Sequence, residues 1–366
     1  MSKVLLVAPS NISDAPYVQY YIRIFEINKV DYDVLYWNRL LEDTYVDPSN
    51  YYSWDVYSDA LGSAWKKMYH AIRFGLYVRK HLQKHEYTSM VVFTVTYSIF
   101  MERFLSRWFK GRFIFDVRDH SPLCNTKIFN CSLEKLVENS AYTVVSSEGF
   151  LKWMPKNKTK YLVDHNVGLE LLKACYDEPI KNMNKEHLNI LTIGQLRDDV
   201  ANAFVMDSFA NNKGYFLTFA GSGWALPILQ KHAEDRGIKN VSFTGRYQKK
   251  DELDIIRQSD MVNAFTGDDI NSRTLMTNRF YNAVLCCKPL IVNADTFQAQ
   301  LCKKYDLGVI VDENADMEPL IHKYISEFDK EKYLTGRLKF LDKVIVDLKQ
   351  FETSVLHIAK LCSIRE

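Results

Sequence analysis

Lys3–Pro9 reads KVLLVAP, and Leu188–Gly194 reads LNILTIG. Each is a short, bare apolar strand, and each opens one half of the chain, in which further strands alternate with amphipathic stretches of helix length. Because that alternation is typical of parallel sheets covered by helices on both faces, we expect an α/β fold with two such units. Two units in one chain make a cleft, and open parallel sheets bind ligands at the carboxyl ends of their strands.

The predicted elements follow from hydrophobic periodicity. The strands expected in the first half are Lys3–Pro9, Asp33–Trp37, Ser89–Thr94, Phe113–Asp116, Ala141–Ser146 and Lys160–Asp164. Those of the second half are Leu188–Gly194, Phe216–Ala220, Val241–Thr244, Met261–Ala264, Pro289–Val292 and Gly308–Val311. The helices expected in the first half are Tyr17–Asn28, Ala64–Lys84, Ile99–Lys110 and Leu133–Asn139. The stretch Asp177–His187 is polar, so we place one domain at 1–180 and a second at 188–340, and we expect the helix within 341–366, near Phe340–Leu361, to pack back across both.

Composition narrows the class of protein. With 366 residues and 47% apolar side chains, the chain can bury two cores. No apolar run approaches the roughly 18 residues of a membrane span, and the start MSKVLLVAPS is too short for a signal peptide. The seven cysteines are odd in number and scattered, which favours a reducing cytoplasm. A net charge of +2 argues against nucleic acid as a partner.

The second half carries an ordered series of motifs. They are Gly194-Gln195-Leu196-Arg197, Phe219-Ala220-Gly221-Ser222-Gly223, Val241–Tyr247 with its Gly245-Arg246-Tyr247, and Thr277–Ile291. In order and spacing they resemble the nucleotide-sugar domain of retaining GT-B glycosyltransferases, of the family-four-like type that includes many bacterial capsule and exopolysaccharide enzymes. The first half adds Phe115–Pro122, Val144–Phe150 and His165–Gly168, which are similar to landmarks of the acceptor domain in that family. The resemblance spans nearly the whole chain and implies two Rossmann-like domains whose parallel sheets face each other across a cleft.

The resemblance also implies a donor site in the second half. Its expected members are Gly194, Arg197, Gly221, Gly223, Arg246, Tyr247, Thr274, Asn278, Arg279 and Asn282. Forked guanidinium donors and a helix N-terminus suit a diphosphate, and glycines suit sharp turns beside a ligand. The alternatives are plain turns for the glycines, a solvated surface residue for Arg197 and a loop aromatic for Tyr247.

Four positions depart from the family pattern. The family has a basic residue directly after the first glycine and a lysine five residues further, where this chain has Gln195 and Val200. It commonly has two glutamates at the places of Thr274 and Asn282, neither of which can be an anionic acceptor. Asn278-Arg279 matches an Asn-Lys pair in capsule-type relatives.

Charged residues follow a buried-looking strand on the acceptor side. They are Asp116, Arg118, Asp119 and His120, and His165-Asn166 follows the next but one strand. We expect Asp119 or His120 to orient or deprotonate the acceptor hydroxyl, with the others lining the acceptor side. The alternative is a salt-bridged turn in which Asp119 caps a helix.

A basic, aromatic stretch lies between Trp54 and Lys84, with Trp65, Tyr69 and Phe74 among lysines and arginines, and Phe104–Lys110 extends it. Such a stretch favours an anionic membrane face with a lipid-linked acceptor. The alternative is a core helix with a solvated charged face.

These patterns lead to one expected function and one alternative. The expected function is a cytoplasmic hexosyltransferase at the inner face of the membrane. It moves a sugar from a UDP- or GDP-linked donor to a glycan or lipid-linked glycan in surface polysaccharide synthesis. No cofactor or metal is expected, since neither a Gly-x-Gly-x-x-Gly after the first strand nor a metal-ligand motif occurs. The alternative is a non-catalytic GT-B protein that binds glycan or stabilises a partner transferase. A nucleotide-sugar epimerase of the same architecture is a third possibility.

Overall fold

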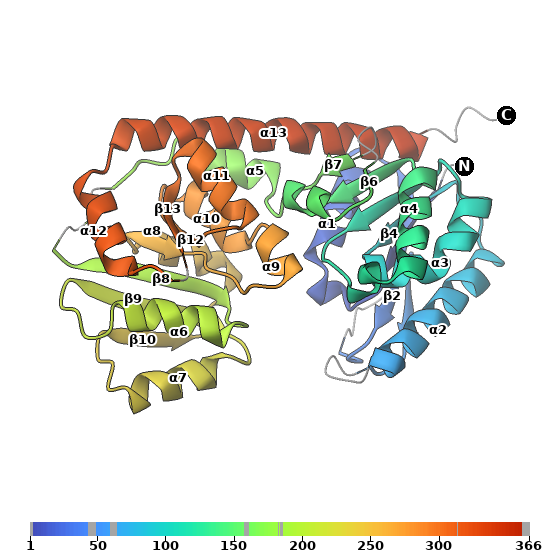
Figure 1. The fold of residues 1–366 in the computed structure, drawn as a ribbon. Coiled ribbons are helices and arrows are strands. Elements are labelled where there is room, and N and C mark those ends of the chain that lie inside the picture. Colours follow the sequence, from blue (N-terminus) through green and yellow to red (C-terminus); the bar gives the residue numbers. More distant parts are fainter. Residues whose placement is uncertain are drawn as a thin grey trace. The chain divides into compact units, whose positions relative to one another are not determined.

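The computed structural model describes residues 3–42, 49–58, 64–156, 161–181, 183, 186–312 and 314–360. These divide into two compact units (Figure 1). Unit 1 contains the described residues of 1–165 and 346–366, and unit 2 those of 166–345. The dividing point near the C-terminus falls inside one long helix, α13 (Lys330–Lys360).

The described part of unit 1 is built on a parallel sheet of seven strands in the order β3-β2-β1-β4-β5-β6-β7. Its strands are β1 (Lys3–Ala8), β2 (Asp31–Asn38), β3 (Tyr51–Asp55), β4 (Ser89–Phe93), β5 (Phe113–Val117), β6 (Tyr142–Val145) and β7 (Tyr161–Val163). Central strands such as β4 (SMVVF) are buried throughout, as expected for parallel strands covered on both faces. Strand order reverses between β1 and β4, so a switch point lies at their carboxyl ends.

Helices cover both faces of this sheet because strand side chains alternate between them. The helices are α1 (Pro16–Ile27), α2 (Ala64–Leu82), α3 (Val95–Trp108) and α4 (Lys127–Asn139). On one face, Tyr21 and Phe25 of α1 share a core with β1, β4 and the last turns of α13, including Phe351. On the other, Trp37 of β2 packs against Phe74 of α2.

The described part of unit 2 has a parallel sheet of six strands in the order β10-β9-β8-β11-β12-β13. Its strands are β8 (Leu188–Gln195), β9 (Tyr215–Ser222), β10 (Val241–Gly245), β11 (Met261–Asn263), β12 (Leu290–Asn293) and β13 (Gly308–Val311). Its helices are α5 (Leu169–Ala174), α6 (Asp199–Ser208), α7 (Leu226–Asp235), α8 (Glu252–Arg257), α9 (Ile270–Thr274), α10 (Asn278–Leu285), α11 (Phe297–Tyr305) and α12 (Met317–Ser326). Here the strand order reverses between β8 and β11.

Every strand predicted from the sequence has its counterpart, although Lys160, at the start of the last predicted strand of unit 1, lies outside the described residues. β3 was not predicted, because YYSWD is only half-buried at a sheet edge and lacks the bare apolar pattern. The final helix begins at Lys330, ten residues before the predicted start; Leu361, its predicted end, is outside the described residues. Helix α7 begins at Leu226, and Gly221 and Ser222 belong to β9.

Candidate functional site

The carboxyl ends of β8 and β9 approach each other through glycines. Gly194 lies opposite Gly221 in the parallel ladder. At Gly221 φ is +141°, and a Cβ would lie 1.8 Å from the Gly194 carbonyl oxygen. Gly223, after β9, would bring a Cβ within 2.1 Å of the Leu196 carbonyl oxygen. Close backbone packing therefore accounts for these two glycines, whereas a Cβ at Gly194, where φ is +107°, would meet no atom within 4 Å.

Arg279 lies at the switch point of unit 2. It is the second residue of α10, whose first turn is capped by the Thr277 hydroxyl accepting from the Phe280 N–H. Its Nη1 lies 3.4 Å from the carbonyl oxygen of Asn263, the last residue of β11, and its Nη2 lies 3.4 Å from that of Gln195, the last residue of β8. The guanidinium thus spans the strand ends between which the order reverses.

The positive charge of Arg279 is poorly compensated by the described residues around it. Among the described residues no carboxylate forms an ion pair with it, although part of its side chain is exposed. Loss of water lowers the pKa of Arg279 to about 10, opposed by the fields of Tyr247 and Asp198. Both weak contacts are to backbone oxygens, so the guanidinium is available to an anion at the N-terminus of α10.

Other predicted donor-side residues lie on the neighbouring strand ends. Arg246 follows β10 and places its Nε 3.3 Å from the Ser222 hydroxyl at the end of β9. Tyr247 donates its hydroxyl to Glu252 at 2.8 Å, and burial and that carboxylate raise the pKa of Tyr247. Arg197 lies in the exposed loop after β8 and makes no hydrogen bond or ion pair with a described residue.

The positions that depart from the family pattern differ in their partners. Thr274 ends α9, is buried, and donates its hydroxyl to the Ile270 carbonyl oxygen at 2.6 Å. Asn278 is exposed at the first position of α10. Asn282, one turn further, is 7% exposed, and its side-chain amide forms no hydrogen bond to a described residue. Because buried amides are normally paired, the Asn282 amide is suited to a ligand or a water molecule.

Buried amides missed by the sequence prediction hold the loop between β11 and α10. Gln298 accepts from the Thr277 hydroxyl at 2.7 Å and donates to the Ala264 carbonyl oxygen at 3.1 Å. Asn293, at the end of β12, donates to the Thr266 carbonyl oxygen at 3.0 Å. The signal in the sequence was asparagine at two successive strand ends, Asn263 and Asn293.

A cavity of about 620 Å³ borders this loop on the side of α6. Phe204 and Phe265 supply apolar walls, and Asp198 and Asp268 supply carboxylates. Asp198 also caps α6 through the Ala201 N–H, and Asp268 pairs with Arg273. Asp198 therefore has two roles: it supplies an acidic acceptor to the cavity, and its charge raises the pKa of Arg279.

The opposite end of α10 is fixed by buried polar contacts. Arg337 of α13, 1% exposed, donates to the carbonyl oxygens of Val284 and Leu285 at the end of α10 and to those of Cys175 and Tyr176 after α5. A cationic side chain at two helix C-termini is favourable because those carbonyls carry partial negative charge.

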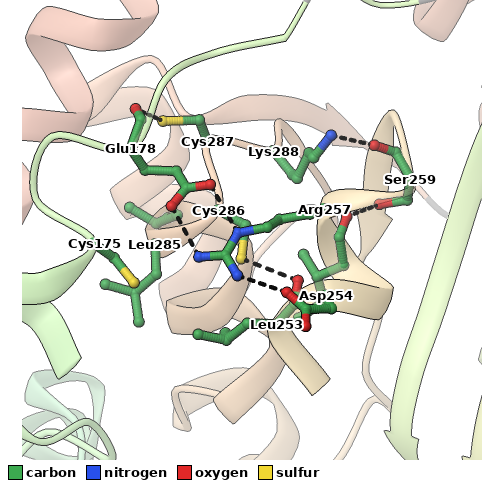
Figure 2. Close-up of polar contacts among 12 residues, drawn as sticks. Cys175, Glu178, Leu253, Asp254, Arg257, Ser259, Leu285, Cys286, Cys287 and Lys288 are labelled. Atoms are coloured by element: carbon green, nitrogen blue, oxygen red, sulfur yellow. Dashed lines mark hydrogen bonds and ion pairs between the residues drawn. The ribbon is translucent and has the colours of Figure 1, made fainter. Parts of the chain in front are cut away.

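Figure 2 shows the cluster beside the end of α10. Arg257 of α8 donates from Nε and Nη2 to the two carboxylate oxygens of Glu178 at 2.8 and 2.9 Å. The Cys287 thiol donates to the Glu178 carbonyl oxygen, and Lys288 donates to the Ser259 carbonyl oxygen. The arginine lowers the pKa of Glu178, which lies in the predicted linker, so this part of the linker is anchored to unit 2.

In unit 1 the structure brings Asp116 and Arg118 together in a buried network. Arg118 donates to both oxygens of Asp116 at 2.5 Å and to Asp164 at 2.6 Å, and its Cζ lies 4.9 Å from the centroid of the Tyr17 ring. The Tyr21 hydroxyl donates to Asp116 at 2.7 Å. Burial raises the pKa of Asp116, and it raises that of Asp164 to about 6 against the pull of Arg118. Asp164 and the two tyrosines were not predicted to be members.

The remaining acceptor-side residues surround this network. Asp119 is exposed just beyond it, whereas the helical turn that follows is capped by Ser121. His120 is half-buried, with its ring edge-on to Trp153 at 4.9 Å between centroids. His165 follows β7 and contacts Asp347 of α13 through Nε2 at 2.9 Å. Asn166 is the first residue of unit 2.

Two features are absent from the part of the chain that the structure describes. No helix there is long and apolar enough to cross a membrane. Within the same residues, no group of three or more His, Cys, Asp or Glu side chains is placed to hold a metal ion.

Comparisons with known proteins identify the fold. Neither a family model nor a curated protein sequence matches the chain. Among solved structures, sucrose-phosphate synthase from Thermosynechococcus elongatus superposes with a TM-score of 0.67 at 12% identity, covering 99% of this chain and 98% of that one. The trehalose-6-phosphate synthase OtsA gives 0.68 at 10% identity, covering 99% of each chain.

A third solved structure was determined with a nucleotide. HepE from Anabaena, in complex with UDP, gives a TM-score of 0.66 at 12% identity, covering 97% of this chain and 100% of that one. Such low identities establish the fold alone. The chain has the two-domain α/β fold of GT-B glycosyltransferases, as its sequence motifs predict.

Proposed function

We propose that the protein is a retaining glycosyltransferase that transfers a sugar from a nucleoside-diphosphate sugar to a glycan or lipid-linked glycan in surface polysaccharide synthesis. The observation that carries this proposal is Arg279, a guanidinium without a carboxylate partner among the described residues, located at the switch point of unit 2. The likeness to HepE, which was solved with UDP, supports a nucleotide at such a site.

The donor diphosphate binds at the N-terminus of α10. Arg279 supplies forked donors, and the free backbone N–H groups of the first turn add to them. Arg197, which is exposed and unpaired among the described residues, supplies a second positive charge. The amide of Asn282 contacts the ribose hydroxyls, and the ring of Tyr247 contacts the base, since the Tyr247 hydroxyl is already used by Glu252.

Acceptor activation is assigned to Asp119 or His120. Both follow β5 at the carboxyl edge of the unit 1 sheet, and the buried Arg118 network behind them fixes the backbone from which they extend. A carboxylate or imidazole within hydrogen-bond reach can orient or deprotonate a hydroxyl. A retaining transfer needs no protein nucleophile when the leaving phosphate assists attack on the same face. The proposed reaction uses no cofactor and takes place in the cytoplasm, at the inner face of the membrane.

The test is a thermal-shift screen of the purified protein against UDP, GDP, their common sugar conjugates and unrelated nucleotides. A ligand that binds only the folded state raises its stability, so selective stabilisation by one diphosphate supports the proposal and identifies the base. No response at millimolar concentration contradicts it. Arg279→Met reduces the shift if the diphosphate occupies this site, whereas the exposed-surface control Lys239→Met retains it.

The second candidate is a non-catalytic GT-B protein that binds glycan or stabilises a partner transferase. It is favoured by Thr274, whose hydroxyl is bonded within its own helix at a place where the family commonly has a glutamate. Donor binding without turnover against a panel of acceptors supports this candidate. Sugar transfer or donor hydrolysis by the wild-type protein that is lost in Asp119→Asn or His120→Gln excludes it.

A further inference from the structure

The outer face of α2 carries an apolar stripe that the core of unit 1 does not use. Trp65, Tyr69, Ile72 and Leu76 are 78%, 56%, 43% and 56% exposed. Their spacing of four, three and four residues places them on one side of the helix. The opposite side, represented by Phe74, is buried against the sheet. α2 therefore has two apolar faces, and among the described residues of unit 1 only one of them is buried.

Positive charge flanks the stripe. α2 contains no Asp or Glu, and its lysines and arginines are all exposed. Arg73, Arg79 and Lys80 make no ion pair with a described carboxylate. The guanidinium of Arg73 lies 5.6 Å from the Tyr69 ring centroid, directly beside the stripe. The apolar stripe matches the apolar interior of a partner, and the basic side chains beside it match negative charge at the boundary of that partner.

A cavity of about 620 Å³ lies at the C-terminal end of the same helix. Its lining combines Arg79 of α2 and Arg112, which precedes β5, with Phe104 and Trp108 of α3. Trp108 is 58% exposed, and Glu86 is the one acidic residue among the described lining residues. The residues that line the cavity directly precede β4 and β5 in the chain, so the cavity lies at the amino edge of the sheet. Asp119 and His120 lie at the opposite, carboxyl edge.

We propose that this surface, the α2 docking face of Trp65, Tyr69, Ile72, Leu76, Arg73 and Lys80, binds the surface of an anionic phospholipid bilayer, with one lipid phosphate received by the cavity at Arg79. Tryptophan and tyrosine favour the boundary between headgroups and acyl chains, and lysine and arginine are attracted to anionic headgroups. This inference rests on the membrane location in the proposed function and deepens it, but its failure is distinguishable from failure of the proposed sugar transfer, because vesicle binding is measured without a sugar donor.

The experiment is co-sedimentation of the full chain with vesicles of phosphatidylcholine, with and without phosphatidylglycerol. We expect binding only to the anionic vesicles. Arg73→Glu with Lys80→Glu lowers the partition coefficient by about tenfold or more. The matched control, Lys231→Glu with Lys323→Glu on exposed helices of unit 2, changes net charge equally and leaves the partition coefficient within about twofold.

Tryptophan emission locates the contact. Anionic vesicles shift the emission of the wild-type protein to the blue, and Trp65→Phe loses most of that shift while it still sediments with the vesicles. Leu76→Ser weakens sedimentation, whereas Ile128→Ser, which removes an exposed apolar side chain on α4, does not. Because these residues are exposed, circular dichroism spectra of the variants remain those of the wild type.

Three results overturn the proposal. The first is equal binding to neutral and anionic vesicles, or no binding to either. The second is complete competition by millimolar inorganic phosphate, which assigns the surface to a free anion. The third is concentration-dependent self-association that Leu76→Ser abolishes, which assigns the α2 docking face to a second copy of the chain.

Discussion

Arg118 and Arg279 lie at the carboxyl edges of the two sheets, yet their surroundings are opposite. Arg118 is buried in unit 1 and shares its donors between Asp116 and Asp164. Arg279 in unit 2 has only two carbonyl oxygens at 3.4 Å and no described carboxylate as an ion-pair partner. The first arginine is part of the fold, whereas the second resembles a binding group that awaits an anion. Replacing Arg118 should therefore lower stability, whereas replacing Arg279 should lower the affinity for an anion.

Removing Arg118 has the largest expected effect on stability. Arg118→Met leaves Asp116 and Asp164 buried without a counter-charge, so we expect a loss of about 3–5 kcal/mol in the free energy of unfolding. Urea unfolding followed by circular dichroism measures this. The control is Arg236→Met, which breaks an ion pair with Asp207 on the surface and costs about 1 kcal/mol or less. A loss below 1 kcal/mol for Arg118→Met contradicts the structural role of the network.

The second prediction concerns pH, because the network holds two carboxylates for one arginine. The pKa of Asp164 is raised to about 6 from 3.8, chiefly by burial. Between these values the folded state keeps a proton that the unfolded state releases, so the Asp164 contribution to stability falls as pH rises from about 4 to about 6. Asp164→Asn removes this pH-dependent contribution. The free energy of unfolding of the wild type minus that of the variant therefore declines by on the order of 2 kcal/mol as pH rises across this range. Parallel curves for the two proteins exclude this assignment.

Arg279 provides the reverse test, and its effect is on binding. We expect Arg279→Met to leave the free energy of unfolding within about 1 kcal/mol of wild type, because it breaks only two long contacts to backbone oxygens. Its affinity for the stabilising nucleoside diphosphate falls about tenfold or more, since a charge-assisted hydrogen bond is lost. Isothermal titration calorimetry measures the affinity. A strongly destabilised variant with unchanged affinity would erase the contrast with Arg118.

Arg197 has the smallest expected effect. It is exposed and makes no hydrogen bond or ion pair with a described residue, so Arg197→Met leaves stability unchanged. Its charge acts on the diphosphate through solvent, and we expect an affinity loss of about fivefold or less. The same titration at higher salt reduces the difference from wild type, because screening weakens exposed charges. A loss equal to that of Arg279→Met would indicate direct contact with the diphosphate.

Most of the fold was predictable because central parallel strands are bare apolar runs. β3 and the first turns of α13 were not. β3 is an edge strand whose side chains are largely half-buried, so YYSWD lacks the continuous apolar run of the central strands. The start of α13 contains Gly336 and Arg337, which look like surface residues, but Arg337 is buried against carbonyl oxygens supplied by α5 and α10. Those partners are more than 50 residues away from Arg337 in the sequence, so the local hydrophobic periodicity cannot indicate them.

The site was predictable as a set of residue types at strand ends and less so as a geometry. Arg279 was named from its motif, but its position over the ends of β8 and β11 follows from strand order. Asp116 and Arg118 were expected together, yet their sharing of Asp164 depends on β7 lying two strands away from β5 in the same sheet. Strand order is a tertiary property, which is why the part played by Asp164 was not identified.

The division of α13 between the units has a consequence for biosynthesis. Phe351, Val355 and Ile358 complete the core formed by β1, β4 and α1, although nearly the whole of unit 2 separates them in the chain. A ribosome makes the first sheet before unit 2, but it makes the segment that closes this sheet only after unit 2. While unit 2 is being synthesised, the face of the first sheet that carries α1 remains only partly covered, and its apolar side chains are exposed to aggregation or to chaperones. The domain that is translated first is therefore the one whose folding is finished last.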